Sequence, residues 1–328
     1  MVYDGCLLQN GVVQGTIQVK VAKGKVDRTT GALAAKVTAT VQMADGSKKL
    51  TFKDGFADAA GNVKGLTAAG RTLALTLGVD GLGGSLDGMD VDGARNLFTA
   101  KDAVATDVDA DWAGKAINIV RGGDVLTVTI AKKGKAKVSG TVNGVKVSAT
   151  SQLLIGETHC CIPVVITKKA QLAFAVCLAG DVVTVAGLAG VKAAGTAGTL
   201  PTGAAFGIDG ADGARALPGL MTTYLPDGLS VEARGAKWVV AGGAKAGKVA
   251  FVRGTGEVDR TKLGANPSGL KLTYKQKDGS FKGSFKVYCL VDGKIKAYTV
   301  NVAGVLVGDK GYGTAAVKGK DGVPVMIE

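Results

Sequence analysis

Three short hairpin signals constrain what this chain can fold into. In each, an alternating apolar and polar stretch is followed by a turn dipeptide and a second alternating stretch; the dipeptides are Asp45-Gly46, Asn143-Gly144 and Asp292-Gly293. Such dipeptides favour a type I′ turn, which needs φ above zero at both central residues and matches the twist of two antiparallel strands. The sequence therefore predicts antiparallel β-structure.

The turn positions also predict which residues face each other. With two-residue loops, the opposing pairs are Val41 with Leu50, Ala39 with Phe52, Val142 with Val145, Val138 with Ala149, Val287 with Tyr298, and Phe285 with Val300. In all three hairpins the apolar partners then lie on one face, as a half-buried antiparallel sheet requires.

Composition and internal repetition extend this prediction to the whole chain. Gly supplies 51 of the 328 residues and aromatic residues only 5%, which is typical of tight turns and small core side chains. Val26-Asp27-Arg28-Thr29 returns as Val258-Asp259-Arg260-Thr261, an indication of internal repeats. We expect an all-β antiparallel barrel or sandwich with little helix, built from three related Gly-rich β-units at residues 1–110, 111–230 and 231–328.

The third unit carries a series of Gly-containing strand motifs. They are Ser268-Gly269, Gly283-Ser284-Phe285, Gly293-Lys294, Val302-Ala303-Gly304-Val305 and Gly311-Tyr312-Gly313. These motifs resemble the Gly-rich β-barrel repeats of large secreted or cell-surface bacterial proteins, best over the third unit, moderately over the first and poorly over the second. The resemblance implies an extracellular or cell-surface module, and it assigns no chemistry to any residue.

The charge balance bears on partners. Lys and Arg outnumber Asp and Glu by 40 to 27, for a net charge of +13. Such an excess favours an acidic partner, for example a polyanionic glycan, or it serves as a solvated Lys-rich sheet face that discourages aggregation. The lysines are dispersed and are not interleaved with stacking aromatic residues, so we expect no specific nucleic-acid site. A glycan or another surface protein is the expected partner, and the oligomeric state is not predicted.

Targeting and membrane segments are not expected. The sequence has no run of about 18 consecutive apolar residues, so we expect no transmembrane helix. Residues 1–5 lack the basic and apolar regions of a signal peptide. The sequence leaves open whether the protein is cytosolic or has lost a signal peptide, and the expected location, outside the cell or on its surface, comes from the resemblance alone.

The cysteines include a candidate disulfide. If 160–167 and 171–178 form a hairpin about Lys168-Lys169, Cys160 falls opposite Cys177, and opposed antiparallel residues nearly meet the Cα separation that a disulfide needs. Small buried thiols in a core are the alternative. The only histidine, His159, would point away from Cys160 on a strand, so neither a Cys–His catalytic pair nor a metal site is expected there.

A Gly-rich stretch, residues 80–93, reads as a loop that carries four carboxylates. Calcium takes six to eight oxygen ligands, so calcium is the one candidate cofactor. The spacing fits neither an EF-hand nor a repeated calcium nonapeptide, and ordinary Asp-Gly turn chemistry is the alternative. The candidate metal ligands are Asp80, Asp87, Asp90 and Asp92.

We expect a noncatalytic structural or binding module of a bacterial cell-surface or secreted assembly, with roles such as adhesion or carbohydrate binding. No phosphate-binding loop, dinucleotide fingerprint or nucleophile elbow is found. One alternative is a binder of acidic glycan or another polyanion. Another is a glycoside hydrolase whose two carboxylates meet only in the fold. Residues that would either stack on a glycan or anchor the core are Tyr3, Trp112, Trp238, Tyr274, Tyr288, Tyr298 and Tyr312.

Overall fold

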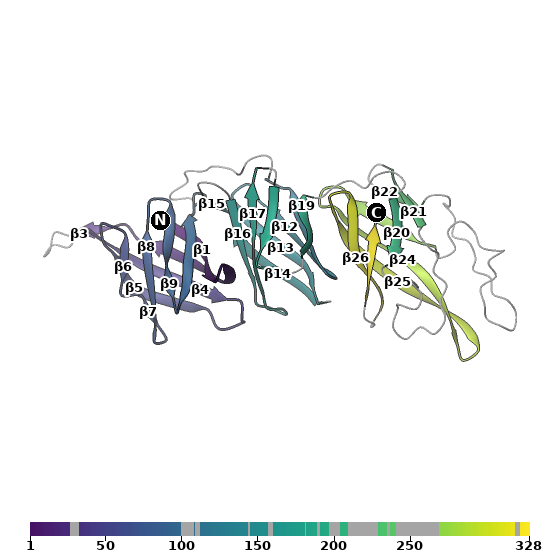
Figure 1. The fold of residues 1–328 in the computed structure, drawn as a ribbon, viewed down its shortest axis with the longest axis horizontal. Coiled ribbons are helices and arrows are strands. Elements are labelled where there is room, and N and C mark those ends of the chain that lie inside the picture. Colours follow the sequence, from purple (N-terminus) through teal and green to yellow (C-terminus); the bar gives the residue numbers. More distant parts are fainter. Residues whose placement is uncertain are drawn as a thin grey trace. The chain divides into compact units, whose positions relative to one another are not determined.

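The protein is built from β-strands joined by turns, as the computed structural model in Figure 1 shows. The structure describes residues 1–26, 33–99, 108, 112–143, 145–156, 160–180, 182–188, 191–196, 204–208, 229–234, 237–240, 269–318 and 322–328. These residues contain no helix, and the predicted all-β antiparallel class is confirmed. Accordingly, the described residues include no helix with the length and hydropathy needed to cross a membrane.

The chain forms two compact units, each assembled from three segments. Unit 1 comprises Met1–Lys115, Val128–Gly140 and Val145–Val191. Unit 2 comprises Ala116–Thr127, Thr141–Gly144 and Lys192–Glu328. These boundaries differ from residues 1–110, 111–230 and 231–328, whose relationship as three repeated units stays a prediction.

The first ten strands belong to unit 1 and form a sheet that closes on itself. They are β1 (Val2–Gln9), β2 (Val12–Val21), β3 (Lys25–Val26), β4 (Leu33–Met43), β5 (Leu50–Ala57), β6 (Asn62–Lys64), β7 (Thr67–Ala68), β8 (Arg71–Leu77), β9 (Gly81–Leu86) and β10 (Met89–Arg95). Their order is β3-β4-β2-β1-β10-β9-β8-β6-β5-β7, and β4 also pairs with β5, so the two sides of the sheet meet in a ring.

Alternation along the strands fills this ring with hydrophobic side chains. On β2, Ile17 and Val19 are buried while Gln18 is exposed, because successive residues of a strand point to opposite faces. The largest fully buried side chains in the ring are Tyr3, Phe52, Leu7, Leu66, Leu73 and Leu86. The predicted pairs Ala39 with Phe52 and Val41 with Leu50 are confirmed. The predicted two-residue loop at Asp45-Gly46 is wrong, because the strands end at Met43 and begin again at Leu50, and only Gly46 of the dipeptide has a positive φ.

Nine further strands follow in two smaller sheets. One has the order β14-β13-β12-β11-β19 and the other β15-β16-β17-β18. Strands β16 and β17 lie against β2 of the ring, within unit 1. The strands are β11 (Ala116–Arg121), β12 (Asp124–Ile130), β13 (Lys135–Val142), β14 (Val145–Gln152), β15 (Leu154–Ile155), β16 (Cys160–Ile166), β17 (Leu172–Ala179), β18 (Val182–Ala186) and β19 (Val191–Thr196).

The last eight strands form a closed barrel in unit 2. They are β20 (Ala204–Ile208), β21 (Leu229–Arg234), β22 (Lys237–Val240), β23 (Lys271–Lys275), β24 (Ser280–Val291), β25 (Lys294–Val307), β26 (Lys310–Val317) and β27 (Val323–Ile327). The predicted pairs Val287 with Tyr298 and Phe285 with Val300 are confirmed. The turn between β24 and β25 has φ values of 51° at Asp292 and 71° at Gly293, as a type I′ turn requires.

Candidate functional site

The four candidate calcium ligands lie on a hairpin, so the expectation of a loop over residues 80–93 is wrong. Asp87 and Gly88 form a two-residue turn with φ values of 50° and 78°, and Leu86 faces Met89 across it. Sequence analysis missed this hairpin because β9 is itself rich in Gly and does not alternate clearly.

The same four carboxylates are exposed and spread along the hairpin. Asp87 pairs with Arg71, and Asp80 lies 3.8 Å from Arg95. Asp90 and Asp92 both project from β10. Among the residues that the structure describes, no three His, Cys, Asp or Glu side chains are grouped so that they could hold a metal ion. Calcium binding by these residues stays a prediction.

The candidate disulfide is corrected in its register. The β16–β17 hairpin is present, but Cys160 faces Leu178, and Cys177 faces Cys161. The connection between these strands is five residues long, 167–171, rather than the two expected. Because the two lengths differ by an odd number of residues, the partner of each β16 residue moves by one position. No disulfide joins Cys160 and Cys177. His159 lies outside the described residues.

The aromatic candidates fall into three groups: buried, half-buried and not described, and Trp112 is one of the half-buried ones. Tyr3 and Tyr274 are buried, and the Tyr3 hydroxyl donates a hydrogen bond to the Gly78 carbonyl at 2.8 Å. Tyr298 and Tyr312 are partly buried against hydrophobic clusters of unit 2. Neither Tyr3 nor Tyr274 can therefore stack on a ligand. The side chains of Trp238 and Tyr288 lie outside the described residues.

A polar surface that sequence analysis did not identify lies on the outside of the unit 1 ring. Because the inward residues of β1, β2 and β4 alternate with outward ones, polar side chains line up across the three strands. In one row Asp4 faces Gln18, which faces Thr40. In the next row Thr16 faces Gln42.

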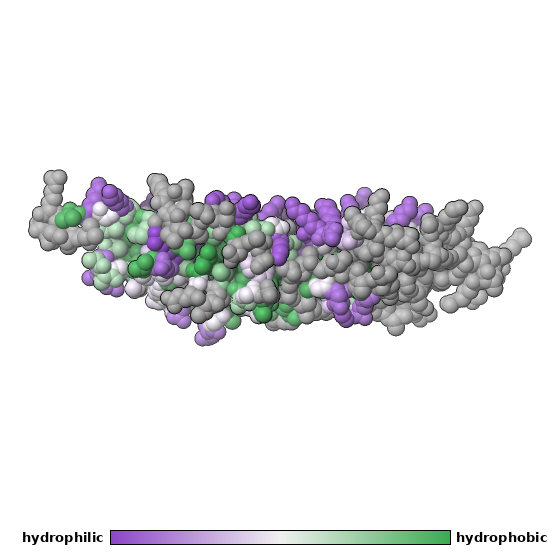
Figure 2. Space-filling model, turned by 90° about the horizontal axis from the view of Figure 1, so that it is seen from above, coloured by the Kyte–Doolittle hydropathy of each residue, from purple (hydrophilic) through white to green (hydrophobic). Residues whose placement is uncertain are grey.

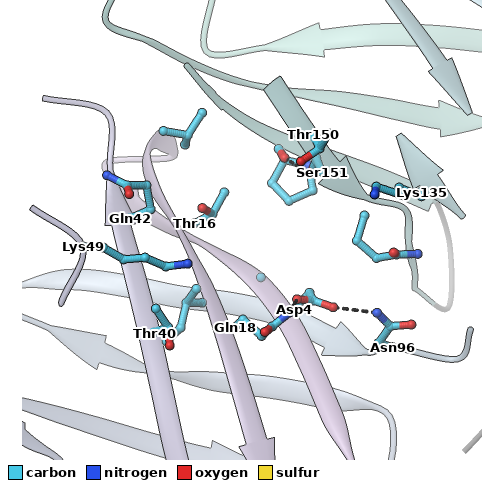
Figure 3. A pocket seen from close by; sticks show the side chains of 15 residues that line it. Asp4, Thr16, Gln18, Thr40, Gln42, Lys49, Asn96, Lys135, Thr150 and Ser151 are labelled. Carbon is cyan, nitrogen blue, oxygen red and sulfur yellow. Dashed lines mark hydrogen bonds between the residues drawn. The ribbon is translucent and has the colours of Figure 1, made fainter. Parts of the chain in front are cut away.

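This surface forms one wall of a pocket of about 420 Å³ inside unit 1 (Figure 3). The opposite wall comes from β13, β14 and β16, and Gln152 is the last residue of β14. The lining side chains from β13 and β14 are polar or charged, whereas those from β16 are apolar. The residues of this wall are Lys135, Thr150, Ser151, Gln152, Pro163 and Val165.

Asp4 is held in a fixed orientation in the pocket. Gln18 Nε2 donates to Asp4 Oδ1 at 2.9 Å, and Asn96 Nδ2 donates to Asp4 Oδ2 at 2.8 Å (Figure 3). Asn96 is itself buried, and its Oδ1 accepts a hydrogen bond from the Phe98 backbone N–H at 3.0 Å. With both oxygens of Asp4 engaged, the two amides are oriented before any ligand arrives.

Two ammonium groups in the lining have no carboxylate partner in the described part of unit 1. Lys49 and Lys135 reach the pocket from the β4–β5 connection and from β13, and both side chains are exposed. Asp4 is the one carboxylate of the lining. The pocket therefore combines hydroxyl and amide groups with an excess of positive charge, which suits a hydroxyl-rich ligand that carries an acidic group.

Elsewhere the surface is mixed. Figure 2 shows both hydrophilic and hydrophobic residues on the described surface in that view.

A comparison with protein-family models, with curated proteins and with solved structures found no match to this chain.

Proposed function

We propose that this chain is a noncatalytic binding module of a bacterial cell-surface or secreted assembly, and that the pocket of unit 1 binds an acidic carbohydrate. The observation that carries the proposal is the lining. Lys49 and Lys135, which have no carboxylate partner among the described residues, stand among hydroxyl side chains and the amides of Gln18 and Asn96, which hydrogen bonds already orient. Sugar hydroxyls both donate and accept hydrogen bonds, so side-chain amides and hydroxyls are suitable partners. A uronic acid or sulfate group would pair with the lysines.

The absence of aromatic residues from this lining shapes the expected binding. Without stacking, affinity depends on hydrogen bonds and on ion pairs that are open to solvent, and such pairs weaken as salt rises. The proposal therefore predicts weak binding to one site, with a clear dependence on ionic strength. Repeated sugars and repeated modules would raise the overall avidity.

The test is calorimetric titration of the full chain with an oligogalacturonate and with a neutral glucan of equal length. We expect binding of the acidic oligosaccharide alone, and a marked loss between low and moderate salt. Lys49→Ala and Lys135→Ala should each weaken binding by about threefold, the size expected of an exposed ion pair. Lys53→Ala, which removes an exposed lysine of β5 that does not line the pocket, is the matched control.

Equal binding of both oligosaccharides, or an affinity that is unchanged by salt and by both pocket lysines, would overturn the proposal. The same samples test the hydrolase alternative, because a hydrolase would shorten the oligosaccharide during the titration. Asp4 is the single carboxylate of this lining, whereas glycoside hydrolysis uses a pair. A purely structural module would bind neither oligosaccharide.

A further inference from the structure

The corrected register of the β16–β17 hairpin brings two thiols together. Cys161 and Cys177 are directly opposed, and their Sγ atoms lie 3.8 Å apart. Opposed residues of an antiparallel pair have Cα separations of about 4.5–5.5 Å, which lie within the range of 4.4–6.8 Å observed for disulfides. The backbone is therefore already placed for a bond, and only the side-chain torsions need to change.

Neighbouring residues keep this pair in a defined environment. Cys161 and Cys177 are half-buried and pack against the outer face of the ring, where Cys6, Val13 and Ala175 form a small buried cluster. Burial raises the pKa of Cys161, and burial followed by the nearby Asp92 raises the pKa of Cys6 to about 12. These thiols are protonated near neutral pH and react slowly with oxidants, because the thiolate is the reactive form.

The pair lies beside the pocket. On β16, Cys161 shares its face with Pro163 and Val165, which line the pocket. On β1, Cys6 is two residues from Asp4 and faces Thr16, another pocket residue. A bond between β16 and β17 would therefore fix a strand that forms part of the pocket wall.

We infer that Cys161 and Cys177 form a reversible cross-strand disulfide when the protein meets a small disulfide oxidant. A thiolate of one cysteine attacks the oxidant RSSR, one RSH leaves, and the second cysteine displaces the other RSH from the mixed disulfide. The S–S bond of the oxidant breaks, one S–S bond forms in the protein, and the two thiol protons end on the two RSH molecules. This inference does not depend on the identity of the pocket's ligand.

The test is to equilibrate the reduced full chain with oxidised glutathione, block the remaining thiols, and map the products by mass spectrometry. Trypsin cleaves after Lys146, Lys168, Lys169 and Lys192, so the two cysteines fall on separate peptides, 147–168 and 170–192. We expect these peptides to be joined, with two fewer blocked thiols than in the reduced chain. Fragmentation of the joined peptides should place the link on Cys161.

Variants separate this link from its neighbour. Cys161→Ser should abolish the joined peptides, whereas Cys160→Ser, the matched control on the adjacent residue, should leave them unchanged. A link from Cys160 to Cys177, or a full count of blocked thiols after equilibration, would overturn the inference. The mapping of the unsubstituted chain decides the question even if a variant does not fold.

Discussion

A pair of glycines in the unit 1 ring provides a sharp test of how closely its strands approach. Gly5 on β1 faces Gly93 on β10. A Cβ atom built on Gly93 would lie 2.5 Å from the Asp4 carbonyl oxygen and 2.7 Å from the Gly5 Cα. Both neighbours are backbone atoms, so no flexible side chain can move aside. The perturbation is Gly93→Ala, which adds one methyl group between two paired strands.

The size of the effect follows from this geometry. The Asp4 oxygen would have to retreat from 2.5 Å to about 3.4 Å, where ordinary van der Waals contact begins. Overpacking of this kind costs about 1–3 kcal/mol of unfolding free energy. With an m-value of about 2 kcal/mol per molar urea, a loss of about 2 kcal/mol lowers the unfolding midpoint by about 1 M.

Gly83→Ala is the matched control, because Gly83 lies on neighbouring β9 and a Cβ atom there meets nothing within 4 Å. It should be neutral or slightly stabilising, since alanine reduces the entropy of the unfolded chain. The assay is urea unfolding of both variants followed by far-ultraviolet circular dichroism. Equal midpoints for Gly93→Ala and Gly83→Ala would refute the close approach of β1 and β10.

Two further predictions concern single hydrogen bonds. Tyr3→Phe keeps the buried ring but removes the bond to the Gly78 carbonyl, so urea unfolding should report a loss of about 1 kcal/mol; an unchanged midpoint would contradict this. The Ser47 backbone N–H donates to Asp45 Oδ1 at 2.8 Å and lowers the pKa of Asp45 below its usual 3.8. A lowered folded-state pKa stabilises the fold above the unfolded-state pKa, and the benefit is lost as pH falls through the folded-state pKa. Near neutral pH, Asp45→Ala should therefore unfold at a lower temperature than the unsubstituted protein, and under acid the two unfolding temperatures should converge. A difference in unfolding temperature that stays the same at every pH would contradict the assignment.

The registers of the β4–β5 and β24–β25 hairpins could be predicted because period-two alternation is local information. In β24–β25 the turn dipeptide, with two positive φ values, also fixes which residues oppose each other, as in Phe285 with Val300. The β16–β17 register could not be predicted in the same way. Its connection, 167–171, is five residues long and contains no such dipeptide, so Cys177 meets Cys161 instead of Cys160.

The pocket was not predictable residue by residue. Thr16, Gln18 and Thr40 occupy outward positions on their strands and look like any solvated sheet face in sequence. What makes them a candidate site is the second wall, from β13, β14 and β16, which comes to face them only through tertiary packing. The one signal available was the concentration of amides and hydroxyls, rather than lysine, at these outward positions.

The closure of the unit 1 sheet limits how another protein could attach to it. A strand in the middle of a sheet has its backbone N–H and C=O groups paired on both sides, and only an edge strand offers them to a newcomer. β1 is paired on one side with β2 and on the other with β10. An incoming polypeptide therefore finds no row of free main-chain donors along β1. A partner that binds there can contact β1 only through side chains.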